Sequence, residues 1–187
     1  MRKGKLFVIS APSGAGKSTV LSCVRKRIRN LDFSISCTTR NPRAGEAHGS
    51  HYHFVERSLF RKMIEEGAFM EWAEVHGELY GTPRAPIEKA IAKGTDVILD
   101  IDVQGGMAIK KIRPEAITIF LLPPSLNELK NRLGGRATES PEQIKLRLAN
   151  AEKEMGFASS YDHKVVNDKV DQACVEICSL IEDARKG

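Results

Sequence analysis

The sequence predicts an α/β protein in which helices cover both faces of a parallel β-sheet. Short apolar runs of strand length alternate with segments in which apolar residues recur at helical spacing. Neither an internal repeat nor a Gly/Ser-rich linker divides the chain. Strands that alternate with helices in this way are typical of βαβ units. We therefore expect one core, interrupted by two strand-poor insertions at about 37–85 and 125–150.

The first half of the chain begins with a buried strand over 6–10, an apolar run that ends in turn residues. From 17 to about 29 the apolar residues fall on one face of a helix. The polar segment 38–50 contains one Pro and two Gly, so we predict a loop there. A short helix over 58–66 and a half-exposed strand over 69–75 follow.

The second half continues the alternation of strands and helices. Buried strands are predicted at 96–101, 116–122 and 164–167. A helix is expected over 104–113, between the first two of these strands. Capping-box patterns at 125–128 (Ser-Leu-Asn-Glu) and 140–143 (Ser-Pro-Glu-Gln) predict the starts of two further helices. We expect Asp168 to cap the final helix.

Length, composition and charge exclude several classes of protein. The chain has 187 residues, 41% of them apolar, and is long enough to build a core without disulfide bonds. Its apolar runs are far shorter than a membrane span of roughly 18 residues, and no export signal is recognisable. We therefore expect a cytoplasmic protein without a membrane partner. The net charge of +5 favours an anionic partner, but the arginines occur at separate points, which argues against a nucleic-acid-binding surface.

The four cysteines do not form a recognisable metal-binding set. Cys174 and Cys178 lie four residues apart in a helical pattern, and neither a second such pair nor a nearby histidine completes a zinc site. We therefore expect Cys23, Cys37, Cys174 and Cys178 to be reduced, partly buried thiols.

The strongest local motif is the segment 11–18, Ala-Pro-Ser-Gly-Ala-Gly-Lys-Ser, between the first strand and the first helix. Its glycines allow the backbone to curl so that N–H groups point inward, and the helix N-terminus adds partial positive charge. Lys17 is placed to reach the outer phosphates of a nucleotide, and the Ser18 hydroxyl to bind Mg²⁺. The strict pattern begins with Gly, where this chain has Ala11. The segment predicts a phosphate-binding loop.

Two aspartates follow the second buried strand. Asp100 directly follows the apolar run 97–99. In proteins with a phosphate-binding loop, an aspartate at the end of such an apolar strand accompanies the loop at the magnesium ion. Asp102 is two residues further on, and would face the same side of an extended strand. The carboxyl ends of parallel strands are where open α/β sheets bind ligands. An alternative is that these aspartates cap the next helix.

Further segments resemble the guanylate kinase family in the order expected of it. They are residues 36–46, 51–54, 69–73, 80–82, 99–105 and 166–168, and the resemblance extends from about residue 4 to residue 185. It implies the transfer of the γ-phosphoryl group of ATP to GMP, giving ADP and GDP, by direct in-line transfer with Mg²⁺. It also implies a three-layer P-loop kinase fold with a core (1–36, 86–124 and 151–187), a GMP-binding domain (37–85) and a lid (125–150).

The resemblance also assigns residues to the GMP site. Four of them would hold the GMP phosphate: Arg40, Arg43, Tyr52 and Tyr80. Glu71 would accept hydrogen bonds from the guanine N1–H and amino group, an arrangement that adenine cannot satisfy. Thr82 and Ser36 would contact the base, and Asp102 would complete the site.

On the donor side, the resemblance implies ATP binding by the loop and by one later residue. The residues implied are Ser13, Gly14, Ala15, Gly16, Lys17, Ser18, Thr19 and Asn167. Ser18 and Asp100 would organise Mg²⁺, directly or through water. The arginines of the lid and the adjoining helix are Arg132, Arg136 and Arg147, which with Lys17, Arg40 and Arg43 form the predicted catalytic set. Such arginines neutralise charge between donor and acceptor.

The chain departs from the family pattern at Ala11, at Leu79, where many members have Tyr, and at Ala137, where Gly is usual. Two other functions remain as alternatives. One is a non-catalytic interaction module, although such modules typically lose the loop lysine or the lid arginines. The other is a P-loop kinase for a different acceptor. The sequence leaves self-association into a homo-oligomer open.

Overall fold

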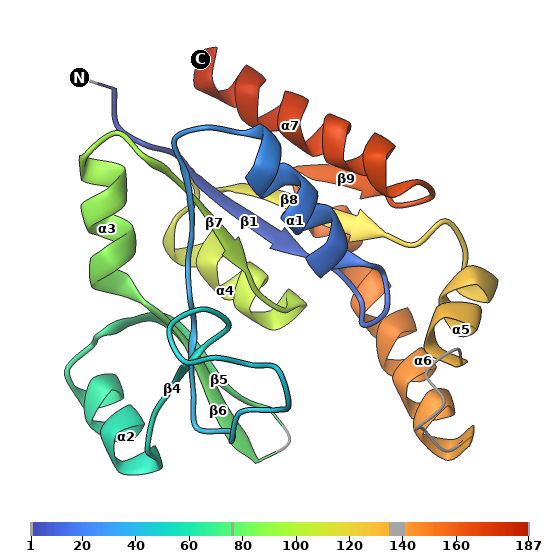
Figure 1. Cartoon of the computed structure of the whole chain (residues 1–187), viewed down its shortest axis with the longest axis horizontal. Helices are drawn as coiled ribbons and strands as arrows, with labels where there is room; N and C mark the ends of the chain where they lie inside the picture. Colours follow the sequence, from blue (N-terminus) through green and yellow to red (C-terminus); the bar gives the residue numbers. More distant parts are fainter. Residues whose placement is uncertain (1, 76, 135–140, 187) are drawn as a thin grey trace.

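The centre of the molecule is a five-stranded, wholly parallel sheet in the order β2-β7-β1-β8-β9 (Figure 1). The computed structural model describes residues 2–75, 77–134 and 141–186. The strands of this sheet are β1 (Leu6–Ser10), β2 (Leu31–Phe33), β7 (Asp96–Asp100), β8 (Ile117–Leu122) and β9 (His163–Val166). The predicted parallel core is confirmed, with the first strand of the chain in the middle.

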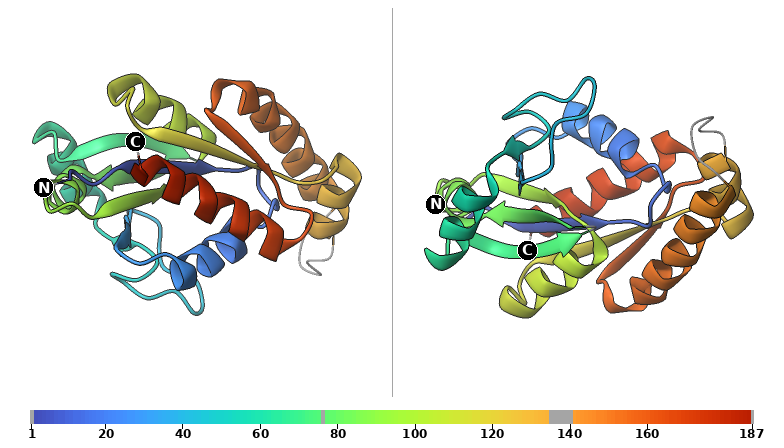
Figure 2. Two further views of the ribbon diagram at one scale, coloured as in Figure 1. Left: turned by 90° about the horizontal axis from the view of Figure 1, so that it is seen from above. Right: turned by 90° about the horizontal axis from the view of Figure 1, so that it is seen from below.

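Helices cover both faces of the sheet, as predicted. Helices α1 (Lys17–Arg27) and α7 (Val170–Lys186) pack on the face that Phe7 and Ile9 present. The other face, formed by alternate residues such as Leu6 and Val8, packs against α3 (Arg84–Ala92) and α4 (Val103–Ile112). Figure 2 shows α1 and α4 on opposite sides of the sheet. Because the three inner strands β1, β7 and β8 are covered on both faces, most of their side chains are apolar in both directions, which explains their uninterrupted apolar runs.

A second sheet occupies the first insertion, so the prediction of a strand-poor insertion at 37–85 is wrong. Its strand order is β4-β3-β6-β5. The strands are β3 (Cys37–Thr38), β4 (His53–Phe54), β5 (Phe69–Val75) and β6 (Glu78–Pro83). Helix α2 (Arg57–Glu65) packs on this sheet through Phe60. Two-residue strands such as β3 and β4 are too short to produce a periodic pattern in the sequence.

The second insertion is helical where it is described. It contains α5 (Leu126–Gly134) and most of α6 (Pro141–Met155), which leads into a short 3₁₀ helix, η1 (Gly156–Ser160). The hydroxyl oxygen of Ser125 accepts a hydrogen bond from the Glu128 amide at 3.1 Å, which confirms the first predicted cap. Ser140 of the second capping box lies outside the described residues.

Several predicted boundaries differ from the structure. Helix α1 ends at Arg27 because Ile28 already adopts an extended conformation. The final helix begins at Val170, and its first turn closes with a hydrogen bond from the Ala173 amide to the Lys169 carbonyl. Lys169, rather than Asp168, therefore occupies the cap position, and that prediction is wrong. Helix α3 and strands β2, β3, β4 and β6 have no counterpart among the predicted elements.

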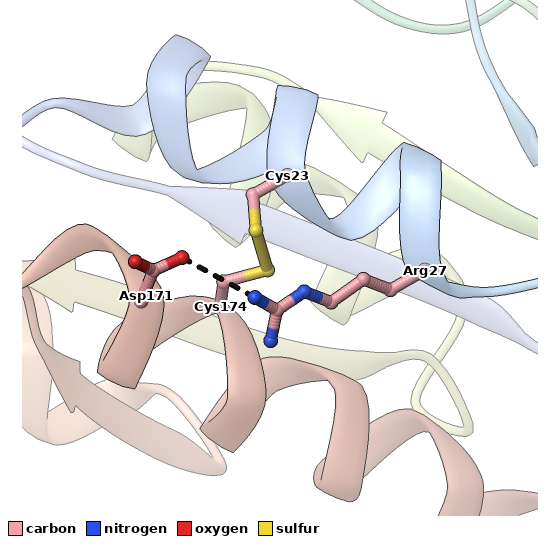
Figure 3. The surroundings of a disulfide bond; sticks show 4 residues. All are labelled: Cys23, Arg27, Asp171 and Cys174. Carbon is pink, nitrogen blue, oxygen red and sulfur yellow. Dashed lines mark hydrogen bonds and ion pairs between the residues drawn. A yellow bond between two sulfur atoms is a disulfide. The ribbon is translucent and has the colours of Figure 1, made fainter.

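A disulfide bond joins Cys23 of α1 to Cys174 of α7 (Figure 3). The prediction of four free thiols is therefore wrong for this pair, and it is confirmed for Cys37 and Cys178. The two bonded residues are 151 positions apart in the sequence, so no local spacing indicates their pairing. An ion pair between Arg27 and Asp171, at 3.2 Å, joins the same two helices.

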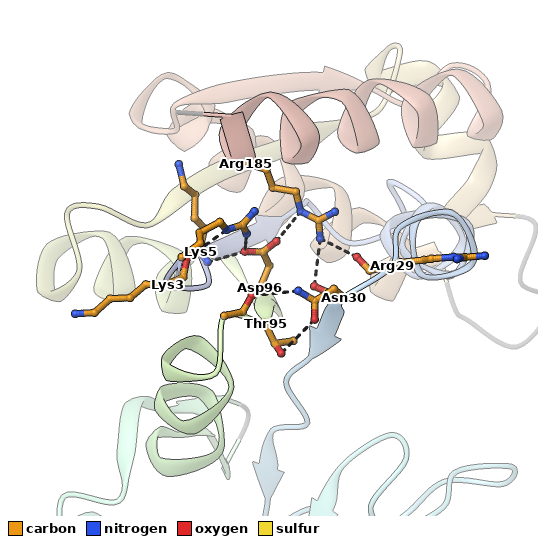
Figure 4. A network of polar contacts seen from close by, with 9 residues as sticks. Lys3, Lys5, Arg29, Asn30, Thr95, Asp96 and Arg185 are labelled. Carbon is orange, nitrogen blue, oxygen red and sulfur yellow. Dashed lines mark hydrogen bonds and ion pairs between the residues drawn. The ribbon is translucent and has the colours of Figure 1, made fainter.

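Both ends of the described chain are fastened to the start of β7 through Asp96 (Figure 4). This carboxylate is fully buried and pairs with the guanidinium groups of Arg2 and Arg185, the latter at 2.7 Å. It also accepts a hydrogen bond from the Lys5 amide at 2.7 Å. These partners hold the pKa of Asp96 below its usual range, against the opposing effect of burial. The network fixes β7, whose other end carries Asp100.

Candidate active site

The phosphate-binding loop has the conformation that its glycines predict. It connects the central strand β1 to α1, and both Gly14 (φ +89°) and Gly16 (φ +87°) adopt the left-handed conformation. Gly16 is the N-cap of α1 and supplies no side chain to the first amides of the helix. Those N–H groups are therefore available to an anion, and the helix dipole favours negative charge at the same point.

Lys17 lies against the end of β7. Its Nζ is 2.8 Å from Oδ1 of Asp100 and donates a hydrogen bond to the carbonyl of Ile101 at 2.5 Å. The fold thus brings together the loop lysine and the aspartate that the sequence predicts as its partner. Ser18 and Asp100 line one cavity of about 440 Å³ beside the loop.

Asn167 and Arg132 support the loop from the side. Asn167 is 2% exposed, and its Nδ2 donates a hydrogen bond to the Ala15 carbonyl at 2.7 Å. Arg132 bonds the Asn167 carbonyl at 3.2 Å and the carboxylate of Glu128 at 3.1 Å. Any side chain at Gly16 would meet the Asn167 amide. In this structure Asn167 therefore braces the loop from a buried position.

Helix α6 contributes two side chains that contact Ser13. A guanidinium N–H of Arg147 donates to the Ser13 hydroxyl oxygen at 2.7 Å. The Ser13 amide donates to the carboxylate of Glu154 at 3.3 Å. Two of the three predicted lid arginines are thus placed at the loop, and Arg136 lies outside the described residues. Glu154 is absent from the predicted set, because nothing in its local sequence distinguishes it from other helical glutamates.

A second cavity, of about 180 Å³, opens between the two sheets and gathers five of the eight residues predicted to bind GMP. Its lining includes Ser36, Tyr52, Glu71, Tyr80, Asp100 and Asp102. Thr82 lies behind this surface and is fully buried. The fold thus collects residues from five separate segments of the sequence around one space.

Glu71 is held by Thr82, whose hydroxyl donates a hydrogen bond to Oε1 of the carboxylate. Burial raises the pKa of Glu71, the Thr82 hydrogen bond opposes this shift, and the nearby charge of Asp102 adds to it. Asp102 is the N-cap of α4 and accepts a hydrogen bond from the Gly105 amide at 2.7 Å. The helix-cap interpretation of Asp102 is therefore confirmed, while its side chain also borders the cavity.

Arg40 forms a two-pronged ion pair with Glu46. Its two terminal nitrogens lie 2.9 and 3.0 Å from the two carboxylate oxygens. The hydrogen bonds from Arg40 and from the Arg43 amide lower the pKa of Glu46 to about 2. Arg40 also lies over the ring of Tyr52, 5.5 Å from its centroid. Glu46 therefore orients the predicted phosphate-binding arginine, a role that its sequence position alone does not indicate.

The departure at Leu79 has a structural explanation. Leu79 is only 4% exposed and packs with Phe60 and Phe69 in the core of the second sheet. Successive side chains on a strand point to opposite faces, so Tyr80 faces the cavity while Leu79 faces the core. Ala137 lies outside the described residues.

The central strand of a parallel sheet runs into a phosphate-binding loop, and a polar acceptor cavity lined by a second sheet lies beside that loop. This combination defines a P-loop kinase of the α/β class. Residues 3–184 match the family described as guanylate kinase. The chain belongs to the guanylate kinase family.

Relatives of known name agree with this assignment. The chain is 49% identical over 181 residues to guanylate kinase of Nocardia farcinica, covering 96% of this chain and 94% of that protein. It is 48% identical over 180 residues to guanylate kinase of Mycolicibacterium paratuberculosis, covering 95% and 81%. The crystal structure of guanylate kinase from Anaplasma phagocytophilum is similar, with a TM-score of 0.79 and 30% identity, covering 98% of this chain and 87% of that one.

Proposed function

We propose that the loop and the acceptor cavity hold ATP and GMP side by side, and that the γ-phosphoryl group passes directly between them. Membership of the family assigns the overall reaction, in which GMP is phosphorylated by ATP. The observation that carries the finer proposal is the position of Asp100. It contacts Lys17 of the loop and lines both the acceptor cavity and the cavity beside Ser18.

Guanine is selected by Glu71 in this proposal. Its carboxylate accepts hydrogen bonds from the N1–H and amino group of guanine, and Thr82 keeps that carboxylate in place. An acceptor base without these donors leaves a half-buried carboxylate unpaired, which is costly. Ser36 and Asp102, which border the same cavity, are positioned to complete the contacts to GMP.

Arg40, Arg43, Tyr52 and Tyr80 bind the GMP phosphate. A dianionic phosphate favours guanidinium donors, to which tyrosine hydroxyls add neutral hydrogen bonds. The rings of Tyr52 and Tyr80 meet edge to face, with centroids 6.0 Å apart, and both side chains line the acceptor cavity. Glu46 presents Arg40 to this site in a fixed orientation.

On the donor side, the amides of residues 13–19 and the Lys17 ammonium bind the phosphates of ATP, and Asn167 supports the loop beneath them. Arg132, Arg136 and Arg147 supply the positive charge that the transferring group requires. A dedicated general base is unnecessary, because a phosphate oxygen of GMP is already anionic at neutral pH.

The residues beside the loop fit a magnesium ion. Ser18 and Asp100 offer the hard oxygen ligands that Mg²⁺ prefers, and they line the same cavity. Within 2–75, 77–134 and 141–186, no cluster of three or more His, Cys, Asp or Glu forms a metal cage. This suits an ion that is held by one carboxylate, waters and substrate phosphates. When bound, Mg²⁺ neutralises charge on the phosphates of ATP.

The proposal divides the chain into a core (1–36, 86–124 and 151–187), a GMP-binding domain (37–85) and a lid (125–150). Closure of the last two over the core excludes water from the transferring group. None of the described helices is both long and apolar enough to cross a membrane. We place the protein in the cytoplasm, with ATP and GMP as its small-molecule partners.

The test is an assay of ADP release with ATP and Mg²⁺ and with GMP, AMP, CMP, UMP or dTMP as separate acceptors. We expect rapid turnover with GMP and little with the other four. Transfer to a different acceptor would leave the loop assignment intact and overturn the role of Glu71. If folded protein binds GMP but transfers phosphate to no acceptor, the chain is a binding module rather than an enzyme.

A further inference from the structure

Glu154 of helix α6 contacts the phosphate-binding loop, and no step of the proposed reaction uses this residue. It is seven residues from Arg147 on α6, which places both side chains on the same face of the helix, two turns apart. Both contact Ser13: Arg147 donates a hydrogen bond to its hydroxyl oxygen at 2.7 Å, and Glu154 accepts one from its amide at 3.3 Å. Helix α6 thus contacts the loop through one cation and one anion.

The two contacts differ in their compatibility with a bound nucleotide. The inward amides of such a loop recognise phosphate oxygens, and Ser13 stands at the start of that series. An arginine is attracted to a phosphate, so Arg147 gains a partner when ATP binds. A carboxylate is repelled by the same phosphate and occupies an amide that the nucleotide requires. Of these two contacts with Ser13, only the one made by Glu154 opposes nucleotide binding.

The surroundings of Glu154 place it in the cleft rather than on the outer surface. It lines a cavity of about 560 Å³ together with Asp102 and Met107. Burial raises its pKa, as does the charge of Asp102, whereas the Ser13 amide and the charge of Lys17 lower it. The charge of Lys17, the lysine that is proposed to bind the ATP phosphates, therefore acts on this carboxylate.

We propose that Glu154 is a displaceable occupant of the phosphate-binding loop, which binds the Ser13 amide in the free protein and leaves when the phosphates of a nucleotide enter. This inference rests on the proposed function, because it assumes that the loop binds ATP. The length of the contact, 3.3 Å, is at the long end of the hydrogen-bond range, as suits an interaction that is readily exchanged. Departure of Glu154 frees α6, and with it Arg147, to move relative to the loop.

The test compares two charge-neutralising variants of the same helix, Glu154→Gln and Glu152→Gln. Glutamine keeps an oxygen that accepts the Ser13 hydrogen bond but removes the charge, so the contact survives without its repulsion. Glu152 is exposed, and its replacement changes the net charge equally. Binding of ATP–Mg²⁺ and, separately, of GMP is measured by titration calorimetry without the second substrate, so that no transfer occurs.

We expect Glu154→Gln to bind ATP roughly tenfold more tightly than the parent protein, as befits removal of one repulsive charge in a partly exposed cleft. GMP affinity should stay unchanged, and Glu152→Gln should bind both nucleotides as the parent does. Equal or weaker ATP binding by Glu154→Gln, or equal tightening by Glu152→Gln, overturns the inference while the proposed function stands. A parent protein that binds GMP but not ATP overturns the proposed function itself, and this inference with it.

Discussion

Removal of the Cys23–Cys174 disulfide is the perturbation whose effect on stability follows most directly from the structure. The bond closes a loop across a sequence separation of 151 residues, and its Cα–Cα distance of 6.0 Å is ordinary for a disulfide. Cys23→Ser is the better variant, because Cys174 is fully buried whereas Cys23 is only partly so. The substitution therefore breaks the bond with little loss of packing.

The expected magnitude comes from the entropy of the unfolded chain. Closing a loop across 151 residues lowers the free energy of folding by about 5 kcal/mol in the chain-entropy treatment. With a urea dependence near ~2 kcal/mol per molar for a protein of this size, the unfolding midpoint of Cys23→Ser should fall by roughly 2.5 M urea.

The assay is equilibrium unfolding in urea, followed by circular dichroism, with and without dithiothreitol. The parent protein in dithiothreitol should unfold at the same urea concentration as Cys23→Ser, and the variant should not respond to the reductant. Cys178→Ser is the matched control, because Cys178 is a free thiol on the same helix as Cys174. It should behave as the parent does in both buffers.

Two results would refute this reasoning. If dithiothreitol leaves the midpoint of the parent unchanged, the bond contributes nothing to stability. If Cys178→Ser is destabilised as much as Cys23→Ser, the loss comes from helix packing rather than from the covalent link.

Three other changes test the site and its support. Glu71→Gln should lower kcat/KM for GMP roughly 100-fold and leave ATP binding intact. Because burial raises the pKa of Glu71, its charged form disfavours folding, so the same variant should be more stable than the parent at neutral pH and equal to it at low pH. Glu46→Gln should raise KM for GMP roughly tenfold by releasing Arg40, with KM for ATP unchanged. Asp96→Asn should lower the free energy of unfolding by about 3 kcal/mol at pH 7. Because the pKa of Asp96 is lowered in the folded protein, its charged form stabilises the fold at pH values above the ordinary aspartate pKa. The difference between variant and parent should therefore shrink as the pH falls below that range.

Each of these expectations has a control or a contrary outcome. Glu74→Gln removes a carboxylate from the opposite face of β5 and should turn over GMP normally, and an equal loss would deny Glu71 its specific role. A lower KM for GMP in Glu46→Gln would mean that the ion pair restrains Arg40 rather than presenting it. A pH-independent destabilisation in Asp96→Asn would assign the effect to packing instead of charge.

The features predictable from sequence are those carried by contiguous residues. The loop at 11–18, the core strands around it and the cap at Ser125 depend on near neighbours, and the structure confirms them. The Cys23–Cys174 bond is a different case, because it depends on the packing of two helices that are distant in the sequence. Of the second sheet, the predicted strand over 69–75 is confirmed as β5, whereas β3 and β4 have only two residues each, too few for a periodic pattern.

The candidate site shows the same division. Family resemblance and chemistry point to Glu71, Tyr52 and Tyr80, and the fold gathers them around one cavity. Glu46 contacts Arg40, six positions away in the sequence, and Glu154 contacts Ser13, 141 positions away. Only the folded structure reveals these two contacts. Supporting residues of this kind have no motif of their own, because any helix or loop can supply a carboxylate.

The central place of β1 in the sheet has a consequence for synthesis of the chain on the ribosome. This strand precedes the other strands of the sheet in the sequence, yet its two hydrogen-bonded neighbours are β7 and β8, whose paired residues begin at Val97 and Ile117. Non-local pairing of this kind is slow to form because a long segment must first be brought together. The nascent phosphate-binding loop therefore has no sheet to anchor it until the residues around Val97 and Ile117 have been translated, and the apolar run of β1 stays without its two neighbours during that interval.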